Sequence, residues 1–454
     1  MKIKFLGAAG MVTGSNFLLE THVANGEPFK VLVDCGLRQG SRYVERPNFE
    51  PFGFDPKEIK AVFVTHAHID HTGLLPKLVK QGFNGKIYGT APTRDFTHEL
   101  LLDSQDILRR EAEQLKEELL YEEADVEKVI ALWQAVKHKE EIMVGPIKAT
   151  FRDAGHILGS MCPILTAEGK TIIFSGDLGN AAPVLIPKHD ALTGISPDYC
   201  VMEATYGNRL HENQDTRHEV LEDVIEDAVK SGGALMIPAF AMERTQALLY
   251  EINELMEHGR IPKIPVFIDS PLAIKLTKVY EKYWNQLTPD VETLTKHLGF
   301  FNFKMLRKTL ATEESKAIND VPNPKIIIAG SGMSNGGRIL HHERRYLSDP
   351  KSTILFMGYQ ASGTLGRRIL DGEPVVKLFG EEISVRCKVR SISGYSAHAD
   401  QKGLLEWIYP MRGSLKKVFL IHGEPDASEV LATKIRDSLA IEAVVPQMNS
   451  EAIL

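Results

Sequence analysis

The sequence predicts a layered α/β fold in which one α/β domain is inserted into another. Short apolar, β-branched runs recur along the chain, and several lead directly to a histidine or an acidic residue, as 61–64 does before His66. Such runs are typical of buried strands, and layered α/β architectures place their sites at the carboxyl ends of strands. Candidate metal-ligating and catalytic residues stop at Glu203 and resume only at His398. We therefore expect one domain built from residues 1–208 and 387–454, with a second domain inserted over 209–386.

The individual elements follow from the same patterns. In the first domain the expected strands each lead to a polar residue: 30–33 to Asp34, 61–64 to the histidine cluster, 148–151 to His156, 171–174 to Asp177, 199–202 to Glu203 and 417–421 to His422. The inserted domain has four further runs of this kind, at 234–237, 266–268, 326–328 and 353–356. Residues 94–136 differ, because leucines recur there at helical spacing among Glu and Lys. We expect two long amphipathic helices in that segment, packed on the edge of the domain.

Composition narrows the class of protein. The chain has 454 residues, of which 43% are hydrophobic and 25% charged, as in ordinary soluble globular proteins of two or three domains. No apolar run approaches the length of a membrane span, so we expect no membrane association. The four cysteines are widely spaced and form no CxxC pair, which predicts reduced core residues in a cytoplasmic protein. The net charge of −7 argues against non-specific coating of nucleic acid but leaves room for a local basic channel.

The segment from His66 to His71 contains three imidazoles and a carboxylate within six positions. Imidazole nitrogen and carboxylate oxygen are ligands that zinc accepts, and a solvated surface gives no reason to crowd them in this way. His66 and His68 share one face of an extended segment, whereas Asp70 and His71 lie at the next turn. The cluster therefore predicts ligands for two metal ions.

Residues far along the chain would complete this site. His156 is expected to join the first ion, His422 the second, and Asp177 has two carboxylate oxygens with which to bridge both. Each ion then keeps room for a water molecule, as a catalytic site requires. We predict a cofactor of two Zn²⁺ ions, with these ligands: His66, His68, Asp70, His71, His156, Asp177 and His422.

These residues resemble the metallo-β-lactamase superfamily, whose hallmark is an HxHxDH cluster followed by later His, Asp and His ligands. Within it, the resemblance is to the β-CASP nucleases, which include the cleavage endonuclease of pre-mRNA 3′-end processing and compact bacterial and archaeal relatives. The acidic motif of the group matches Glu203 in EATYG, and its two histidine motifs match His398 in SAHAD and His422 in HGE. The resemblance covers essentially the whole chain. It implies an αββα sandwich with an inserted β-CASP domain and a catalytic cleft between them.

The resemblance also implies roles for individual residues. Hydroxide made available near neutral pH by the two zinc ions would attack phosphorus, and Asp70 counts among the catalytic residues as well as the ligands. His398 is the expected general acid for the departing ribose oxygen, with Glu203 keeping its imidazole protonated and oriented. Asp34 matches the early aspartate motif. It either fixes the geometry of a ligand or caps a turn, and the sequence leaves both interpretations open.

A glycine-rich loop over residues 330–338 follows one of the expected strands of the inserted domain. Around Ser331 and Gly332 its backbone amides are expected to cradle a phosphate of the substrate, with Arg338 adding positive charge. The alternative is a tight turn that needs glycine for its backbone conformation alone.

Together these features predict a zinc-dependent ribonuclease that hydrolyses single-stranded RNA, as an endonuclease, a 5′-3′ exonuclease or both. A DNA-directed nuclease and a small-molecule metallo-hydrolase of the same superfamily are alternatives, although the latter class lacks the large insertion. A non-catalytic RNA-processing scaffold is the alternative from another class, and the intact set of ligands argues against it. The expected partner is single-stranded RNA, and a homo-oligomer is compatible with an enzyme of this size.

Overall fold

The computed structural model describes residues 1–40, 42–115, 118–181, 183–211, 216–289, 291, 301, 303–361, 363–392 and 394–454. The chain forms two compact units. The first contains residues 1–183, 187–210 and 397–454, and the second contains 184–186 and 211–396. Among the described residues, no helix is both long and apolar enough to cross a membrane.

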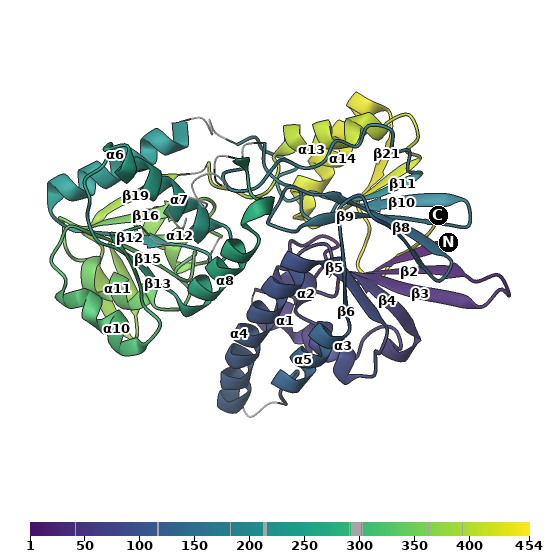
Figure 1. The fold of residues 1–454 in the computed structure, drawn as a ribbon, viewed down its shortest axis with the longest axis horizontal. Helices are drawn as coiled ribbons and strands as arrows, with labels where there is room; N and C mark the ends of the chain where they lie inside the picture. The colour runs from purple at the N-terminus through teal and green to yellow at the C-terminus, as the bar shows by residue number, and fades with distance from the viewer. Residues whose placement is uncertain are drawn as a thin grey trace. The chain divides into compact units, whose positions relative to one another are not determined.

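The first unit is built on two seven-stranded sheets that pack face to face (Figure 1). One sheet has the order β22 (Glu451–Ile453), β1 (Lys2–Phe5), β2 (Phe17–His22), β3 (Pro28–Val33), β4 (Ile59–Phe63), β5 (Lys86–Thr90) and β6 (Trp133–Val136). The other has the order β21 (Glu442–Val444), β20 (Lys417–Ile421), β11 (Tyr199–Glu203), β10 (Lys170–Phe174), β9 (Met161–Ala167), β8 (Ile147–Asp153) and β7 (Glu141–Val144). Phe5, Phe63, Phe151 and Phe174 are buried in one core cluster drawn from both sheets, because alternate strand residues point inward.

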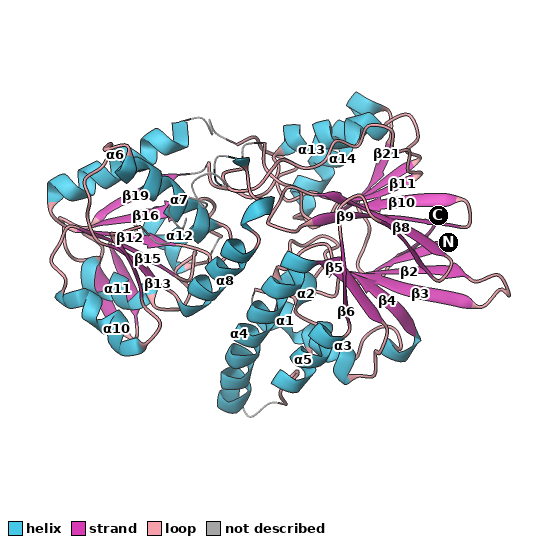
Figure 2. Cartoon of the chain, in the orientation of Figure 1, coloured by secondary structure: helices cyan, strands magenta, loops and turns pink. Residues whose placement is uncertain are grey.

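Helices cover the outer face of each sheet (Figure 2). On one side lie α1 (Arg42–Glu45), α2 (Ile69–Thr72), α3 (Leu75–Lys80), α4 (Ala91–Leu115) and α5 (Glu123–Ala131). On the other side lie α13 (Gln401–Ile408) and α14 (Pro425–Leu439). Each helical layer buries its apolar stripe in a separate core cluster against its own sheet. The αββα order confirms the predicted fold class.

The segment 94–136 departs from the prediction of two long helices. The first helix, α4, is long, but α5 ends at Ala131 and the chain then continues as the edge strand β6. Trp133 explains the change, since its ring packs where a Cβ on Gly89 would lie and its Nε1 donates to the Gly89 carbonyl at 3.1 Å. Burial in the sheet therefore overrides the helical spacing of the sequence.

The second unit is built on a six-stranded parallel sheet of order β14 (Leu306–Lys308), β13 (Val266–Asp269), β15 (Lys325–Ala329), β12 (Ala234–Pro238), β16 (Thr353–Met357) and β19 (Lys388–Ile392). Its helices are α6 (Arg217–Ser231), α7 (Arg244–Glu257), α8 (Pro271–Lys282), α10 (Thr312–Ala317), α11 (Ile339–Tyr346) and α12 (Leu365–Leu370), and β17 (Val375–Leu378) pairs with β18 (Glu381–Ser384). The unit continues to Ser396 rather than ending at residue 386, because β19 pairs along its whole length with β16.

Candidate metal centre

The predicted ligands lie just after strands of the first unit, in loops and in one short helix, and the fold brings them together. His66 and His68 follow β4, and Asp70 and His71 lie in the short helix α2. Distant parts of the chain supply the rest: His156 follows β8, Asp177 follows β10 and His422 follows β20. The carboxyl ends of strands in the two packed sheets thus converge on one place, as expected for a layered α/β fold.

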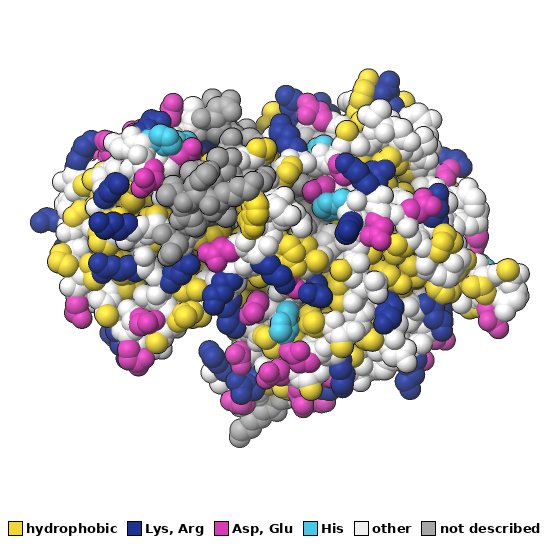
Figure 3. Space-filling model, in the orientation of Figure 1, with side chains coloured by type: hydrophobic (Ala, Val, Ile, Leu, Met, Phe, Trp, Pro, Cys, Tyr) yellow, Lys and Arg dark blue, Asp and Glu magenta, His cyan; other side chains and the backbone are white. Residues whose placement is uncertain are grey.

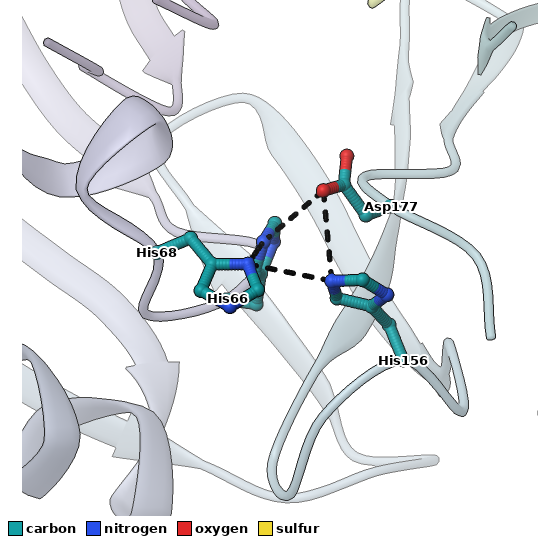
Figure 4. Close-up of side chains that lie close together, drawn as sticks. All are labelled: His66, His68, His156 and Asp177. Atoms are coloured by element: carbon teal, nitrogen blue, oxygen red, sulfur yellow. Dashed lines mark hydrogen bonds and ion pairs between the residues drawn. The ribbon is translucent and has the colours of Figure 1, made fainter. Parts of the chain in front are cut away.

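The first cluster consists of three imidazoles and one carboxylate, drawn in Figure 4. Nε2 of His66 lies 3.0 Å from Nδ1 of His68, which lies 3.3 Å from Nε2 of His156. Oδ2 of Asp177 lies 3.4 Å from the His66 nitrogen and 3.6 Å from the His156 nitrogen. Four donor atoms therefore face a common point at the spacing expected around a tetrahedral cation.

The second cluster lies on the other side of Asp177 and consists of Asp70, His71 and His422. Nε2 of His422 lies 3.1 Å from Oδ2 of Asp70. The other carboxylate oxygen of Asp177, Oδ1, lies 3.3 Å from Nε2 of His71 and 3.6 Å from Nδ1 of His422. Asp177 thus presents one oxygen to each cluster, which is the arrangement that a bridging carboxylate requires.

The donor set fits metal ions on two independent grounds. Oδ1 of Asp177 is buried and has no hydrogen-bond partner among the described residues, although an unsatisfied buried carboxylate oxygen is costly. In the first cluster, burial lowers the pKa of His66 to about 4 and that of His68 to about 3. Burial likewise lowers the pKa of His156 well below its ordinary value. These imidazoles are therefore neutral near pH 7, with lone pairs available for a cation.

The second cluster has the opposite electrostatic character. Burial lowers the pKa of His71, but the carboxylates of Asp177 and Asp34 outweigh it and raise that pKa well above its ordinary value. For His422 too, burial is outweighed by Asp177 and Asp70, and the pKa rises. This side of the site carries an excess of carboxylate charge, and a bound cation would neutralise it in place of the protons.

Asp34 and Thr65 support the ligands from behind. Oδ2 of Asp34 lies 2.7 Å from Nδ1 of His71, and its Oδ1 accepts a hydrogen bond from the backbone N–H of Thr65 at 2.7 Å. The Thr65 hydroxyl donates to the same carboxylate at 2.8 Å. Asp34 adopts φ of +59° and His422 φ of +51°, a left-handed conformation that is uncommon outside glycine and is concentrated at functional sites. Of the two interpretations of Asp34, the geometry favours the one that fixes a ligand.

His398 and Glu203 form a separate pair beside Asp177. Nδ1 of His398 lies 3.2 Å from Oε2 of Glu203, while its Nε2 lies 4.0 Å from Oδ2 of Asp177. Glu203 is fully buried, and its Oε1 accepts a hydrogen bond from the backbone N–H of Leu178 at 2.6 Å. Burial lowers the pKa of His398, but the charge of Glu203 outweighs it and raises that pKa to about 9. His398 is therefore protonated near neutral pH.

The backbone around His398 is fixed by the loop that carries Asp177. His398 forms an antiparallel bridge with Gly179, flanked by hydrogen bonds from Asn180 N–H to the Ala397 carbonyl and from Ala399 N–H to the Leu178 carbonyl. A Cβ on Gly179 would lie 1.7 Å from the carbonyl oxygen of Gly155, next to His156. Only glycine permits this approach, so the three loops that carry Asp177, His156 and His398 are locked together.

The three predicted substrate-binding residues belong to the second unit. Ser331 and Gly332 lie in the loop after β15, where the Ser331 hydroxyl accepts a hydrogen bond from the Asn335 N–H at 3.0 Å. The guanidinium of Arg338 is held by Oδ1 of the buried Asp269 at 2.8 Å and by two backbone carbonyls. Much of the charge of Arg338 is thus neutralised within its own unit.

Sequence reasoning missed two side chains that shape the site. Thr65 contacts Asp34 and lies 3.1 Å from Nδ1 of His66, while the Thr205 hydroxyl lies 3.1 Å from Nδ1 of His422. Both threonines follow the carboxyl end of a strand. Thr65 stands one residue before His66, and Thr205 stands two residues after Glu203. That position was the only signal available, because the partners of Thr205 lie more than two hundred residues away in sequence.

Family models match three parts of the chain. The model of the metallo-beta-lactamase superfamily matches residues 17–238, and that of the Beta-Casp domain matches residues 245–369. A third, described as a Zn-dependent metallo-hydrolase RNA specificity domain, matches residues 382–446. The first of these matches covers the segment in which most of the clustered ligands lie.

Several proteins are similar over nearly the whole chain. A ribonuclease of Thermus thermophilus is 38% identical, with 94% of each chain covered. An RNase J-like protein of Methanocaldococcus jannaschii is 31% identical, with 98% of this chain and 97% of the relative covered. Transcription termination factor FttA of Methanosarcina mazei is 32% identical over 97% of this chain and 70% of its own length. A solved structure, a protein of unknown function from Enterococcus faecalis V583, shares the fold with a TM-score of 0.57 at 12% identity, covering 100% of this chain and 99% of that one.

Proposed function

Because this chain belongs to the metallo-β-lactamase superfamily and to its β-CASP group of RNA-processing nucleases, we propose that it is a zinc-dependent ribonuclease acting on single-stranded RNA. Its relatives and family models place it among metal-dependent ribonucleases, and zinc and the single-stranded substrate are our additions. The observation that carries the proposal is the pair of donor clusters that share Asp177. The proposal includes both the endonuclease and the 5′-3′ exonuclease mode, which the digestion experiment below separates.

The residues of the two clusters would hold two zinc ions. The neutral imidazoles of the first cluster suit one ion, and Asp70, His71 and His422 suit the other, with Asp177 between them. Bound there, two zinc ions would supply a nucleophile at neutral pH and neutralise the charge that develops on a transferring phosphoryl group. Asp70 contributes both a ligand and a negative charge next to the reacting centre.

His398 supplies the proton that the reaction needs at its end. A ribose oxygen that leaves phosphorus as an alkoxide is strongly basic, and a positioned acid lowers the barrier to its departure. The imidazolium of His398 is held by Glu203 through Nδ1, and we assign the proton donation to its Nε2–H, which lies 4.0 Å from Oδ2 of Asp177. Glu203 is in turn fixed by the Leu178 N–H, which keeps the pair oriented toward Asp177.

Residues of the second unit would contact the substrate. We assign phosphate contact to the loop at Ser331 and Gly332, through the Ser331 hydroxyl and the main chain. Arg338 takes a double role in this assignment, because it anchors the loop through Asp269 and leaves a partly exposed cation beside it. On the face drawn in Figure 3, Lys and Arg side chains are interspersed with Asp and Glu. A uniformly basic surface would favour non-specific binding of nucleic acid, whereas this mixed surface suits binding along a defined path.

Location and assembly are also part of the proposal. All four cysteines are buried and free, which is typical of proteins in a reducing compartment and supports a cytoplasmic location. A homo-oligomer is compatible with the proposal, and sedimentation of the purified protein would measure its size.

One digestion experiment tests the activity. A 5′-labelled single-stranded RNA, the matched DNA and the matched RNA duplex are incubated with zinc-loaded protein, and both product ends are mapped. We expect cleavage of the single-stranded RNA, and the product ladder reveals endonuclease or exonuclease mode. Preferential cutting of DNA would make the protein a DNA-directed nuclease. Turnover of nitrocefin or a thioester without RNA cleavage would make it a small-molecule hydrolase. Tight RNA binding by zinc-free protein without cleavage would make it a scaffold.

A further inference from the structure

An aromatic side chain lies next to the proton donor. The ring of Tyr206 stands 6.0 Å from the ring of His398, centroid to centroid, at an interplanar angle of 78°. The guanidinium of Arg209 lies over the same tyrosine ring at 5.5 Å. Tyr206 is partly exposed and Arg209 is exposed. A partly exposed aromatic ring with a guanidinium over it therefore lies beside the group that protonates the departing oxygen.

The turn that carries Tyr206 is held rigidly. It begins at the end of β11, where the Gly207 N–H donates to the Ala204 carbonyl at 3.1 Å. Gln401, at the start of α13, donates its side-chain amide to the Gly207 carbonyl at 2.7 Å and its backbone N–H to the Arg209 carbonyl at 3.0 Å. From α14, Asp426 accepts a hydrogen bond from the Asn208 amide at 3.0 Å. Two helices thus fix the turn, so that Tyr206 needs little ordering to receive a ligand.

Stacked tyrosine and arginine side chains have a recognised use in binding nucleic acid. Unpaired bases stack on aromatic rings and on guanidinium planes, and such contacts tolerate any base because every base has a π face. A base inside a duplex is already stacked on its neighbours and is unavailable for this contact. A platform of this kind next to the reacting centre would therefore accept a single-stranded nucleotide and discriminate against a paired one.

We propose that Tyr206 and Arg209 form a stacking platform for one unpaired nucleobase, that of the nucleotide which carries the departing oxygen. This inference rests on the proposed ribonuclease function and adds a contact that positions the substrate. Proximity favours this nucleotide, because the ring of Tyr206 lies next to that of His398, and His398 protonates that oxygen. In this proposal Tyr206 positions the substrate, and Gln401 contributes by holding the turn that carries Tyr206.

The test removes the ring from the protein and the base from the substrate in turn. Short single-stranded RNAs with one mapped cleavage site are made intact, or with an abasic sugar on either side of the scissile bond. They are digested by the zinc-loaded wild-type protein, Tyr206→Ala, Tyr206→Phe and Tyr409→Ala. The last is a matched control, because Tyr409 carries the guanidinium of Arg412 at 4.0 Å but lies in the 3₁₀ turn at the other end of α13 from His398.

On intact RNA we expect Tyr206→Ala to lower kcat/KM by roughly 5- to 150-fold, the range for loss of one base–aromatic stack, and Tyr206→Phe to retain most of it. On the RNA that lacks the base next to the departing oxygen, wild type and Tyr206→Ala should be equally slow. Removal of the other base should leave the effect of Tyr206→Ala in place. An equal loss from Tyr206→Ala on all three substrates would overturn the proposal, since the tyrosine would then act without a base.

A binding measurement separates this proposal from the proposed function. RNA with 2-aminopurine at the expected position should lose fluorescence on binding to wild type and recover it with Tyr206→Ala, whether or not cleavage follows. Quenching that depends on Tyr206 without any cleavage would support the platform and refute the ribonuclease assignment. RNA cleavage together with quenching that is unchanged in Tyr206→Ala would support the ribonuclease assignment and refute the platform. Absence of RNA binding would refute both.

Discussion

Asp34→Asn isolates the contribution of the residues behind the metal ligands. The substitution keeps the size of the side chain but turns one carboxylate oxygen into an N–H donor. Oδ2 of Asp34 lies 2.7 Å from Nδ1 of His71, so the wild-type contact requires the proton of the neutral imidazole to sit on Nδ1. Nε2, which lies 3.3 Å from Asp177, then carries the lone pair that a cation needs. An amide N–H facing Nδ1 favours the opposite tautomer, in which the proton blocks Nε2.

The size of the effect follows from the burial of the contact. Asp34 is 1% exposed and its carboxylate also accepts two hydrogen bonds from Thr65, so the variant has no water with which to replace the lost interaction. Mutation of a carboxylate behind a ligating histidine typically lowers metal affinity about 10- to 100-fold, or about 1.4–2.7 kcal/mol. Oδ1 can still accept from the Thr65 N–H, so we expect a smaller effect on folding of the metal-free protein, about 1–2 kcal/mol.

The assay is a competition titration of zinc between the protein and a chromophoric chelator. Wild type, Asp34→Asn and a matched control, Asp55→Asn, are compared at one pH. Asp55 is exposed, and its side chain caps a short helix by accepting from the Lys57 N–H, so it tests the same chemical change away from the metal. Equal zinc affinity in wild type and Asp34→Asn would refute the tautomer argument and return Asp34 to the role of a turn cap.

Three further predictions follow from the site and the second unit. His398→Ala should keep its zinc and its melting temperature but lose about 10²- to 10⁴-fold in RNA cleavage, as expected when only a general acid is removed; full activity would contradict the role. Asp177→Ala should release metal, and an unchanged zinc content by elemental analysis would contradict its place between the clusters. Burial raises the pKa of Glu343 to about 7, although a hydrogen bond from Ser334 lowers that pKa in part. The stability from its protonated form is complete below the unfolded pKa near 4.5 and is lost as pH rises through about 7. Between pH 5 and pH 8, the stability of Glu343→Gln should therefore rise by roughly 2.5 kcal/mol relative to that of wild type, and parallel pH profiles of unfolding would contradict this.

The sequence was most informative where a strand ends in a ligand. The residues that form the two clusters were predictable because each has a side chain suited to metal binding and stands just after an apolar run, or in the compact His66–His71 segment. The local sequence pattern was enough to predict these residues, because the fold gathers the ends of its strands at one edge. It was also enough to place the strands of the inserted domain, which are the central strands of the second sheet.

Features that depend on distant partners were not predictable in this way. Thr205 contacts His422 across the sequence, and the engagement of Arg338 by Asp269 follows from the packing of α11 on the second sheet. Strand β6 was misjudged as helix because the leucine spacing before it is helical, whereas Trp133 gains more by packing over Gly89. In each case the deciding interaction joins residues that no window of the sequence contains together.

The proposed chemistry depends above all on a two-metal centre bridged by Asp177. Crystals grown with zinc, with diffraction collected on both sides of the zinc absorption edge, measure this directly. We expect two anomalous peaks, one within the cluster of His66, His68 and His156 and one beside Asp70 and His422, with Asp177 between them. A map with no peak among these side chains, or with a single peak that does not contact Asp177, would contradict the proposed two-metal centre.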